Sequence, residues 1–100
     1  MMKLIFEWDA NKARQNITKH KVSFEEARTL FNDPLLVTFM DNYHSADEER
    51  YISIGTSAKR RILLVVHTDL DEAQDSFDIR LISSRKGTAS ERRVSEEGRT

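Results

Sequence analysis

Residues 61–67 constrain the fold most strongly, because Arg61 and His67 are separated by an unbroken run of apolar residues. A short run that is apolar at every position indicates a strand buried on both faces, and therefore one in the middle of a sheet. Strand-like segments lie before it, at residues 35–40 and 50–54, and after it, at residues 77–85. The connections are too short for crossover helices, so these strands are expected to form an antiparallel meander.

Alternation in residues 77–85 predicts which side chains of the last strand face the core. A period of two places Arg80, Ile82 and Ser84 on one face, away from the apolar face of the strand. An arginine on a sheet needs an anion or an ion-pair partner. Arg80 is therefore a candidate for binding phosphate.

Helical patterns flank the strands. Residues 10–20 are expected to form a helix capped by Asp9, and Ser23 with Glu26 forms the S-x-x-E capping box of a second helix. A short third helix is expected over residues 88–97. The predicted fold is therefore α+β, with an N-terminal helical pair packed on an antiparallel sheet and a short C-terminal helix.

The composition limits the classes of protein that remain. A chain of 100 residues is expected to form one domain, residues 1–100. It has no cysteine, no apolar run of membrane-spanning length and no glycine-rich phosphate loop, and its three histidines show no metal-ligand spacing. We therefore expect a cytoplasmic protein with no cofactor, no metal and no membrane partner.

The charges are unevenly distributed along the chain. A net charge of −1 argues against a dedicated nucleic-acid-binding protein, which is usually strongly basic. Residues 59–61 and 80–93 are nevertheless rich in arginine and lysine, whereas residues 69–78 hold five acids and no base. Two interpretations remain open: RNA on one side with a basic partner on the other, or a solvated surface.

Cleavage of RNA without a metal needs a base, an acid and cations around the reacting phosphate. Arg80 and Arg85 could supply the positive charge, but arginine is a poor base. As alternatives, Arg80 could pair with a strand acid such as Glu49, and Arg85 could cap the sheet edge.

The acid and base are less clearly indicated. His67 ends the central strand and could transfer protons or be structural. Glu91 could be a base, could orient Arg85 and Arg92, or could be solvated. His20 ends a helix, where attraction to the helix dipole and capping of carbonyls explain it without catalysis.

The chain resembles the BrnT toxin family over roughly residues 5–97. The shared motifs are Phe6-Glu-Trp-Asp9, Lys12, Asn16, Lys19-His20, residues 22–27, Phe31 and Asp33, followed by Glu49-Arg50, Gly55, residues 64–67, 80–83, 85–86 and 91–93. Each motif alone is weak, but their combination in this order is specific.

The resemblance implies a ribonuclease toxin with a RelE-like fold from a bacterial type II toxin–antitoxin pair. Such a protein would cut RNA without a metal, inhibit translation, and be neutralised by a BrnA-like antitoxin with a ribbon-helix-helix part. Operator DNA would be bound only through the toxin–antitoxin complex. The expected catalytic residues are Arg80, Arg85, His67 and Glu91, and the expected RNA-binding residues are Arg50, Arg61, Lys86 and Arg92.

Three positions depart from the family pattern. Lys21 stands where the family has a glycine suited to a left-handed helix cap, Ser84 where it has alanine, and Ser95 where it has tyrosine. An aromatic ring or phenol missing at position 95 could weaken activity. The alternative function is a catalytically inactive module that binds RNA or antitoxin and acts only in operon autoregulation. A further possibility is that residues 69–78 dock a basic partner.

Overall fold

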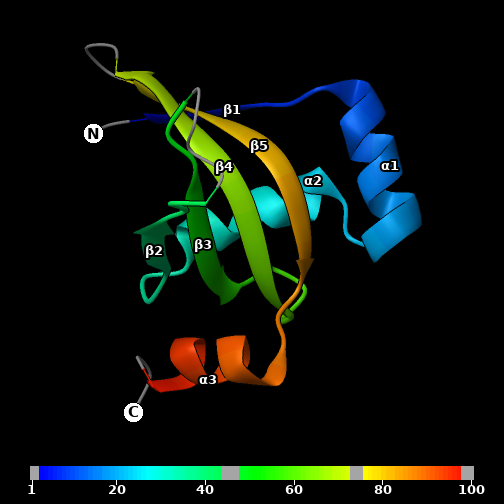
Figure 1. Ribbon diagram of the computed structural model, residues 1–100, viewed down its shortest axis with the longest axis vertical. Coiled ribbons are helices and arrows are strands. Elements are labelled where there is room, and N and C mark those ends of the chain that lie inside the picture. The colour runs from blue at the N-terminus through cyan, green and yellow to red at the C-terminus, as the bar shows by residue number, and fades with distance from the viewer. Residues whose placement is uncertain (1–2, 44–47, 73–75, 98–100) are drawn as a thin grey trace.

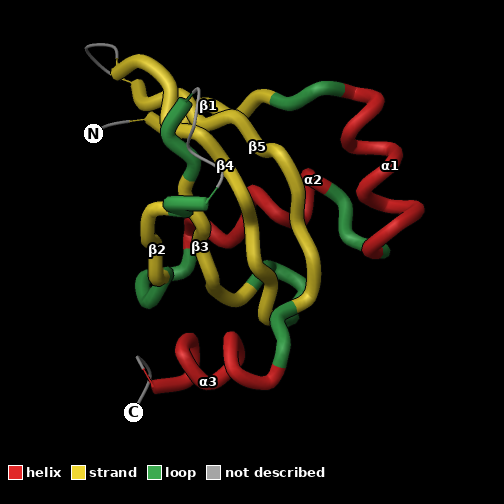
Figure 2. Tube along the Cα trace, in the orientation of Figure 1, coloured by secondary structure: helices red, strands yellow, loops and turns green. Residues whose placement is uncertain are grey.

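The computed structural model describes residues 3–43, 48–72 and 76–97, in which five strands form a single sheet of order β1-β5-β4-β3-β2 (Figures 1 and 2). The elements in chain order are β1 Lys3–Glu7, α1 Ala10–His20, α2 Phe24–Ala27, the 3-10 helix η1 Arg28–Asn32, β2 Val37–Met40, β3 Tyr51–Thr56, β4 Ile62–Glu72, β5 Ser76–Lys86 and α3 Ala89–Glu97. The predicted α+β class is confirmed.

β4 is the central strand, as its apolar sequence predicts. It pairs antiparallel with β3 on one side and with β5 on the other, and β2 pairs antiparallel with β3. The predicted meander is therefore confirmed over β2–β5. Leu63 and Val65 belong to the buried core with residues of α2 and η1, whereas Leu64 and Val66 face the other side of the sheet.

β1 adds a pairing that the meander does not include. It runs parallel to β5, from Lys3 opposite Ser76 to Glu7 opposite Arg80. β1 and β2 occupy opposite edges of the sheet, so the helices between them carry the chain across one face (Figure 2). The sheet is therefore mixed, and only that face is covered by the segment containing α2 and η1.

Local capping explains where α1 begins and ends. The Asp9 carboxylate accepts the Asn11 amide at 3.0 Å, which fixes the first turn. Lys21 then adopts a left-handed conformation with φ 60°, and its N–H donates to the Ile17 carbonyl at 2.9 Å. The left-handed cap expected at Lys21 is confirmed, and this backbone costs about 1 kcal/mol in a residue with a side chain.

The second helix starts where the sequence predicts but changes type after one turn. The Ser23 hydroxyl accepts the Glu26 amide at 3.1 Å, and the α-helix ends at Ala27, where η1 follows. The Glu26 carboxylate accepts hydrogen bonds from Ser57 and Arg61, in another part of the chain.

Among the described residues, no helix has the length and apolar character needed to cross a membrane.

A β-bulge in β5 corrects the predicted alternation of its side chains. Val66 lies opposite Ser83, but the next residue of β4, His67, lies opposite Leu81, so β5 has one extra residue at this point. Ser84 consequently pairs with Val65 on the core side and is 1% exposed, whereas it was expected to share a face with Arg80.

Asn16 holds α1 to the sheet where β1 has already ended. Its side-chain amide donates to the Ser84 carbonyl at 2.8 Å, and its carbonyl oxygen accepts the Ser84 amide at 3.0 Å. It also donates to the Val22 carbonyl at 2.8 Å. A buried side chain thus satisfies the backbone edge of β5 at Ser84, beyond Arg80, where the pairing with β1 ends.

Removal of this amide is expected to destabilise the fold. Asn16→Ala leaves buried backbone groups of Ser84 and Val22 without partners, so the free energy of unfolding should fall by about 2–4 kcal/mol in urea titrations. Gln15→Ala, which removes an amide from the exposed side of the same helix, should change it by less than about 0.5 kcal/mol. Equal effects of the two substitutions would show that Asn16 does not hold the edge of β5.

Candidate functional site

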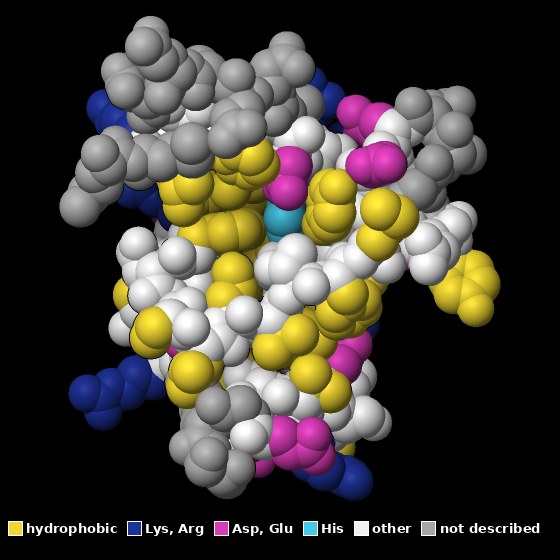
Figure 3. Space-filling model, turned by 90° about the vertical axis from the view of Figure 1, so that its left-hand side faces the viewer, with side chains coloured by type: hydrophobic (Ala, Val, Ile, Leu, Met, Phe, Trp, Pro, Cys, Tyr) yellow, Lys and Arg dark blue, Asp and Glu magenta, His cyan; other side chains and the backbone are white. Residues whose placement is uncertain are grey.

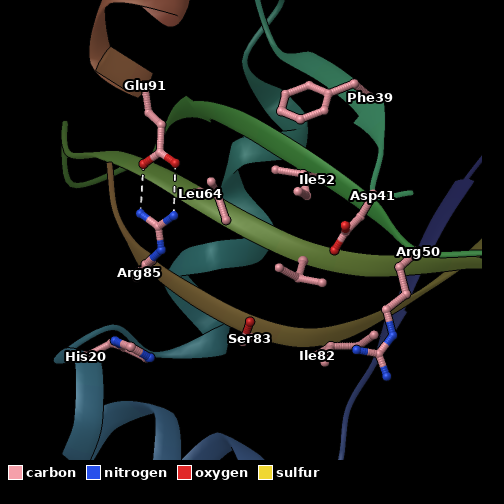
Figure 4. A pocket seen from close by; sticks show the side chains of 11 residues that line it. His20, Phe39, Asp41, Arg50, Ile52, Leu64, Ile82, Ser83, Arg85 and Glu91 are labelled. Atoms are coloured by element: carbon pink, nitrogen blue, oxygen red, sulfur yellow. Dashed lines mark hydrogen bonds and ion pairs between the residues drawn. The ribbon is translucent and has the colours of Figure 1, made fainter. Parts of the chain in front are cut away.

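A cavity of about 480 Å³ lies on the side of the sheet opposite the core formed with α2 and η1 (Figure 4). Strands β3, β4 and β5 contribute its floor, while the end of α1, the β2 region and α3 contribute its rim. The lining residues are His20, Phe39, Asp41, Arg50, Ile52, Leu64, Val66, Ile82, Ser83, Arg85 and Glu91.

The floor of the cavity is apolar. Ile52, Leu64 and Val66 come from adjacent strands and point to the same face, because Ile52 pairs with Val66 across β3 and β4. Phe39 stands at the rim and is 45% exposed (Figure 4). Figure 3 shows hydrophobic side chains gathered on the side of the molecule that carries β2. An apolar surface left open in this way suits an apolar or aromatic part of a ligand.

Charged groups stand at the two ends of this floor. Arg85 and Glu91 lie at one end, and Arg50 and Asp41 lie at the other (Figure 4). Arg85 faces the cavity because it pairs with Leu64 beyond the bulge in β5. A strict period of two would have put Arg85 on the face opposite Arg80, so the bulge gives both arginines the same face.

Glu91 binds Arg85 in a two-point ion pair. Two guanidinium nitrogens donate to its carboxylate at 2.7 and 2.9 Å, and the Thr88 amide donates to it at 2.8 Å at the start of α3. The Arg85 hydrogen bonds hold the pKa of Glu91 down to about 2. Glu91 is therefore ionised at neutral pH and is a weak base, and it fixes the orientation of Arg85.

The cavity includes one histidine, His20, whose place at a helix end predicts capping rather than catalysis. It is the last residue of α1, and its imidazole lies on the rim near Ser83 (Figure 4). The left-handed turn at Lys21 directs the chain away immediately after it. No sequence signal shows that the end of α1 meets β5, because Asn16 and Ser84 are 68 residues apart.

Arg80 lies outside the cavity, on the same face of the sheet. Its side chain is 46% exposed, and its nitrogens lie 4.0 Å from a Glu7 oxygen and 3.9 Å from a Glu48 oxygen. Such long, exposed ion pairs contribute little stability. The ion pairing considered from the sequence occurs with these two acids, whereas Glu49 accepts from the Tyr51 hydroxyl at 3.0 Å.

His67 lies on the core side of β4, where it is 2% exposed. Its Nε2 is 2.8 Å from the Ser53 hydroxyl and its Nδ1 is 3.0 Å from an Asp69 oxygen, and its ring stacks on Tyr51. Burial lowers the pKa of His67, and the Asp69 carboxylate opposes this shift only in part. The structure does not bring His67 to the cavity that contains Arg85.

The remaining basic residues with predicted RNA contacts gather in a second cleft. It has a volume of about 360 Å³ and lies between the β3–β4 turn and α3. We call it the basic cleft; it is lined by Arg60, Arg61, Ile62, Lys86, Gly87, Arg92 and Glu96. Of the predicted RNA-binding residues, only Arg50 is in the first cavity.

Ser95, where the resemblance predicts a tyrosine, is not among the residues that line either space. It is fully buried on α3, which packs against β3 and β4, and its hydroxyl has no hydrogen-bond partner among the residues that the structure describes. Residues 73–75 of the predicted acidic docking segment lie outside the described residues.

Within the described parts of the chain, no group of three or more His, Cys, Asp or Glu side chains is placed to hold a metal ion.

Comparison with known proteins gives two findings. A family model described as the ribonuclease toxin BrnT of type II toxin–antitoxin systems matches residues 8–91. The crystal structure of the Brucella abortus ribonuclease toxin BrnT is similar in fold, with a TM-score of 0.57 and 24% sequence identity over 88% of this chain and 99% of that one. No curated protein sequence matches significantly.

The Arg85–Glu91 pair should contribute stability that depends on pH. Because the folded pKa of Glu91, about 2, lies below its ordinary value of 4.5, the contribution is fully present above pH 4.5 and is lost as the pH falls towards 2. Glu91→Gln should therefore lower the free energy of unfolding by about 1 kcal/mol at pH 7, and by clearly less at pH 3.

Urea denaturation at the two pH values measures this difference, with Glu25→Gln on an exposed position of α2 as the control. A loss for Glu91→Gln that is the same at pH 3 as at pH 7 would contradict the assigned ion pair.

Proposed function

The chain belongs to the BrnT family of ribonuclease toxins of type II toxin–antitoxin systems, and we propose that it cleaves RNA in the cavity between Arg50 and Arg85. The observation that carries this proposal is the placement of these arginines at the two ends of one apolar floor. Phosphates of a single strand would bind at the ends, and a sugar or base would lie on the floor between them.

Arg85 is proposed to stabilise the charge that develops on the reacting phosphate. Its guanidinium is held by Glu91 from the α3 side, so its direction is fixed before RNA binds. In the reaction, the RNA 2′-hydroxyl loses its proton to a base and its oxygen bonds to the adjacent phosphorus. The bond from phosphorus to the 5′-oxygen breaks and that oxygen takes up a proton, which leaves a 2′,3′-cyclic phosphate and a 5′-hydroxyl. This reaction transfers protons but uses no redox partner, and the proposal includes no metal ion.

His20 is proposed to transfer a proton in this reaction. Histidine is the side chain that most often serves as a general acid or base, and His20 is at the rim of the cavity. His67 is the alternative group, but its two ring nitrogens are already bonded to Ser53 and Asp69. Arg80 is proposed to guide RNA along the same face of the sheet, where RNA phosphates would replace its weak contacts with Glu7 and Glu48.

Membership of a type II family implies an antitoxin partner. We propose that this partner is a BrnA-like protein with a ribbon-helix-helix part, and that operator DNA is bound only through the complex of the two proteins. We also place the protein in the cytoplasm, where its RNA substrate occurs. Purification of the toxin together with the product of the neighbouring gene would test the partner directly.

One observation favours the alternative of an RNA-binding module without catalysis. Both terminal nitrogens of Arg85 already donate to Glu91, which balances much of the charge that a transition state needs. A protein in this state could bind RNA and antitoxin and act only in autoregulation. Cleavage assays on the purified protein separate the two functions.

Arg85→Ala should lower the rate of cleavage of single-stranded RNA in EDTA by about a hundredfold, the usual effect of removing one preorganised charge. The products of the parent protein should carry 2′,3′-cyclic phosphate ends. Arg28→Ala, which removes an exposed arginine from the helical layer, is the matched control and should cleave normally. Full activity of Arg85→Ala would remove Arg85 from the site, and an inactive parent would favour the binding module.

The two histidines should separate activity from stability. His20→Ala should lower cleavage by about a hundredfold or more with little change in the melting temperature, because His20 is only half-buried at the rim. His67→Ala should lower the free energy of unfolding by about 2 kcal/mol, because it leaves the buried Ser53 hydroxyl without its imidazole partner. A folded His67→Ala protein without activity, beside an active His20→Ala protein, would assign proton transfer to His67.

A further inference from the structure

The basic cleft is lined by cationic side chains and shares no lining residue with the cavity that contains Arg85. We infer that it binds backbone phosphates of the RNA on one side of the cleaved bond, an inference that rests on the proposed ribonuclease function. Its ligand is therefore the phosphodiester backbone of single-stranded RNA. It would add affinity for longer RNA without selecting bases, because contacts to phosphates carry no sequence information.

The charges of the cleft favour an anion although the whole chain carries −1. Arg61 is paired with Glu26, which leaves Arg60, Lys86 and Arg92 beside one acid, Glu96. Within the described part of the chain, the side chains of these three residues make no hydrogen bond or ion pair. Cations that are grouped in a concave site without protein partners raise the local concentration of an anion.

The turn that carries Arg60 is held rigidly. The Ser57 hydroxyl donates to a Glu26 oxygen at 2.6 Å, and the same carboxylate accepts from Arg61 Nε at 2.9 Å. Glu26 is 5% exposed, and these bonds hold the pKa of its carboxyl below its usual value, chiefly through Arg61. A buried, ionised carboxylate therefore anchors the turn between β3 and β4 to α2.

Arg60 itself occupies an unfavourable backbone conformation. Its φ is 62°, in the left-handed region, and its amide donates to the Ser57 carbonyl at 2.9 Å. A glycine would adopt this conformation without strain, so the arginine is present at a cost in stability. Strained residues of this kind occur preferentially where a side chain serves binding.

Gly87 keeps the floor of the cleft open. A Cβ atom at this position would lie 3.3 Å from Ile62 Cγ2 and 3.5 Å from Arg92 Cγ. The Gly87 amide donates to the Ile62 carbonyl at 3.0 Å, which fixes the turn between β5 and α3. The stem of Arg92 can thus lie close to the backbone beside Lys86.

The cleft and the cavity meet at the same corner of the molecule. Lys86 follows Arg85 at the end of β5, and Arg92 follows Glu91 on α3, and in each case the two neighbours line different spaces. A single RNA strand that passes over the end of β5 would therefore contact both. This continuity favours RNA over an acidic segment of a protein partner as the occupant.

Binding of RNA that cannot be cleaved tests the inference without depending on catalysis. The probes are 2′-O-methyl oligonucleotides of three and twelve residues, which lack the attacking hydroxyl, and binding is followed by fluorescence anisotropy at several salt concentrations. Lys86→Gln/Arg92→Gln should weaken binding of the longer probe about tenfold and reduce its logarithmic salt slope by about 1.4, since each phosphate contact on a single strand contributes roughly 0.7. Binding of the trinucleotide should not change.

The control is Lys12→Gln/Arg28→Gln, which removes the same charge from exposed positions of α1 and η1. A second variant, Arg60→Gly, should bind the longer probe more weakly while its melting temperature stays the same or rises, because glycine relieves the left-handed strain. Loss of affinity caused by unfolding cannot produce that combination.

The outcomes distinguish this inference from the proposed function. If the parent cleaves RNA but the cleft variants bind the longer probe as the control does, the cleft is not an RNA site and the ribonuclease proposal stands. If the parent does not cleave RNA but the cleft variants bind the longer probe more weakly than the parent and bind the trinucleotide equally well, the cleft binds RNA and the ribonuclease proposal fails. If the cleft variants bind a polyglutamate peptide more weakly than the control variant does but bind RNA equally well, the inference is overturned in favour of an acidic protein partner.

Discussion

The bulge in β5 determines which residues of that strand reach the cavity. One extra residue between Leu81 and Ser84 keeps both of them on the core side, and it turns Arg85 towards the opposite face. The position of Arg85 in turn sets that of Glu91, and therefore how the first turn of α3 sits against the sheet. Bulges are common next to active sites for this reason, because they redirect a side chain without ending the strand.

Two arginine–carboxylate pairs hold the ends of the central strands. Glu26 binds Arg61 where β4 begins, and Glu91 binds Arg85 where β5 ends. In each pair the carboxylate belongs to a helix and the arginine to the sheet region, so the pair fixes how a helix meets the sheet. The pairs also neutralise two cations, so that Arg60 and its neighbours in the basic cleft carry the charge that remains for a ligand.

The net charge of −1 argued against RNA as a ligand, yet the cations are not spread evenly in space. Folding brings the turn at residues 59–61 next to Lys86 and Arg92, although more than twenty residues separate them in the sequence. The total charge bears on solubility and long-range attraction, whereas a binding site depends on the charges within a few ångströms of the ligand. A near-neutral chain can therefore contain a strongly basic cleft.

Much of the candidate site could not be read from the sequence. The sequence indicates the basic end of β5, but it also predicts that His67 and Arg80 act with Arg85, and it explains His20 by helix capping. The sheet separates His67 from the cavity, and contact between α1 and β5 brings His20 to it. Contacts of this kind join residues far apart in the chain, and no local pattern reports them.

The sequence by itself determined the helices at α1, α2 and α3, the order of strands β2 to β5, the central place of β4, the caps at Asp9 and Ser23, and membership of the family. These features follow from periodicity and from side chains that bond to nearby backbone, both of which are local. The tertiary structure decided the parallel pairing of β1, the bulge in β5 and the division of the basic residues between a cavity and a cleft. Those features depend on pairing register and on packing between distant segments, which are settled only when the whole sheet closes on its helices.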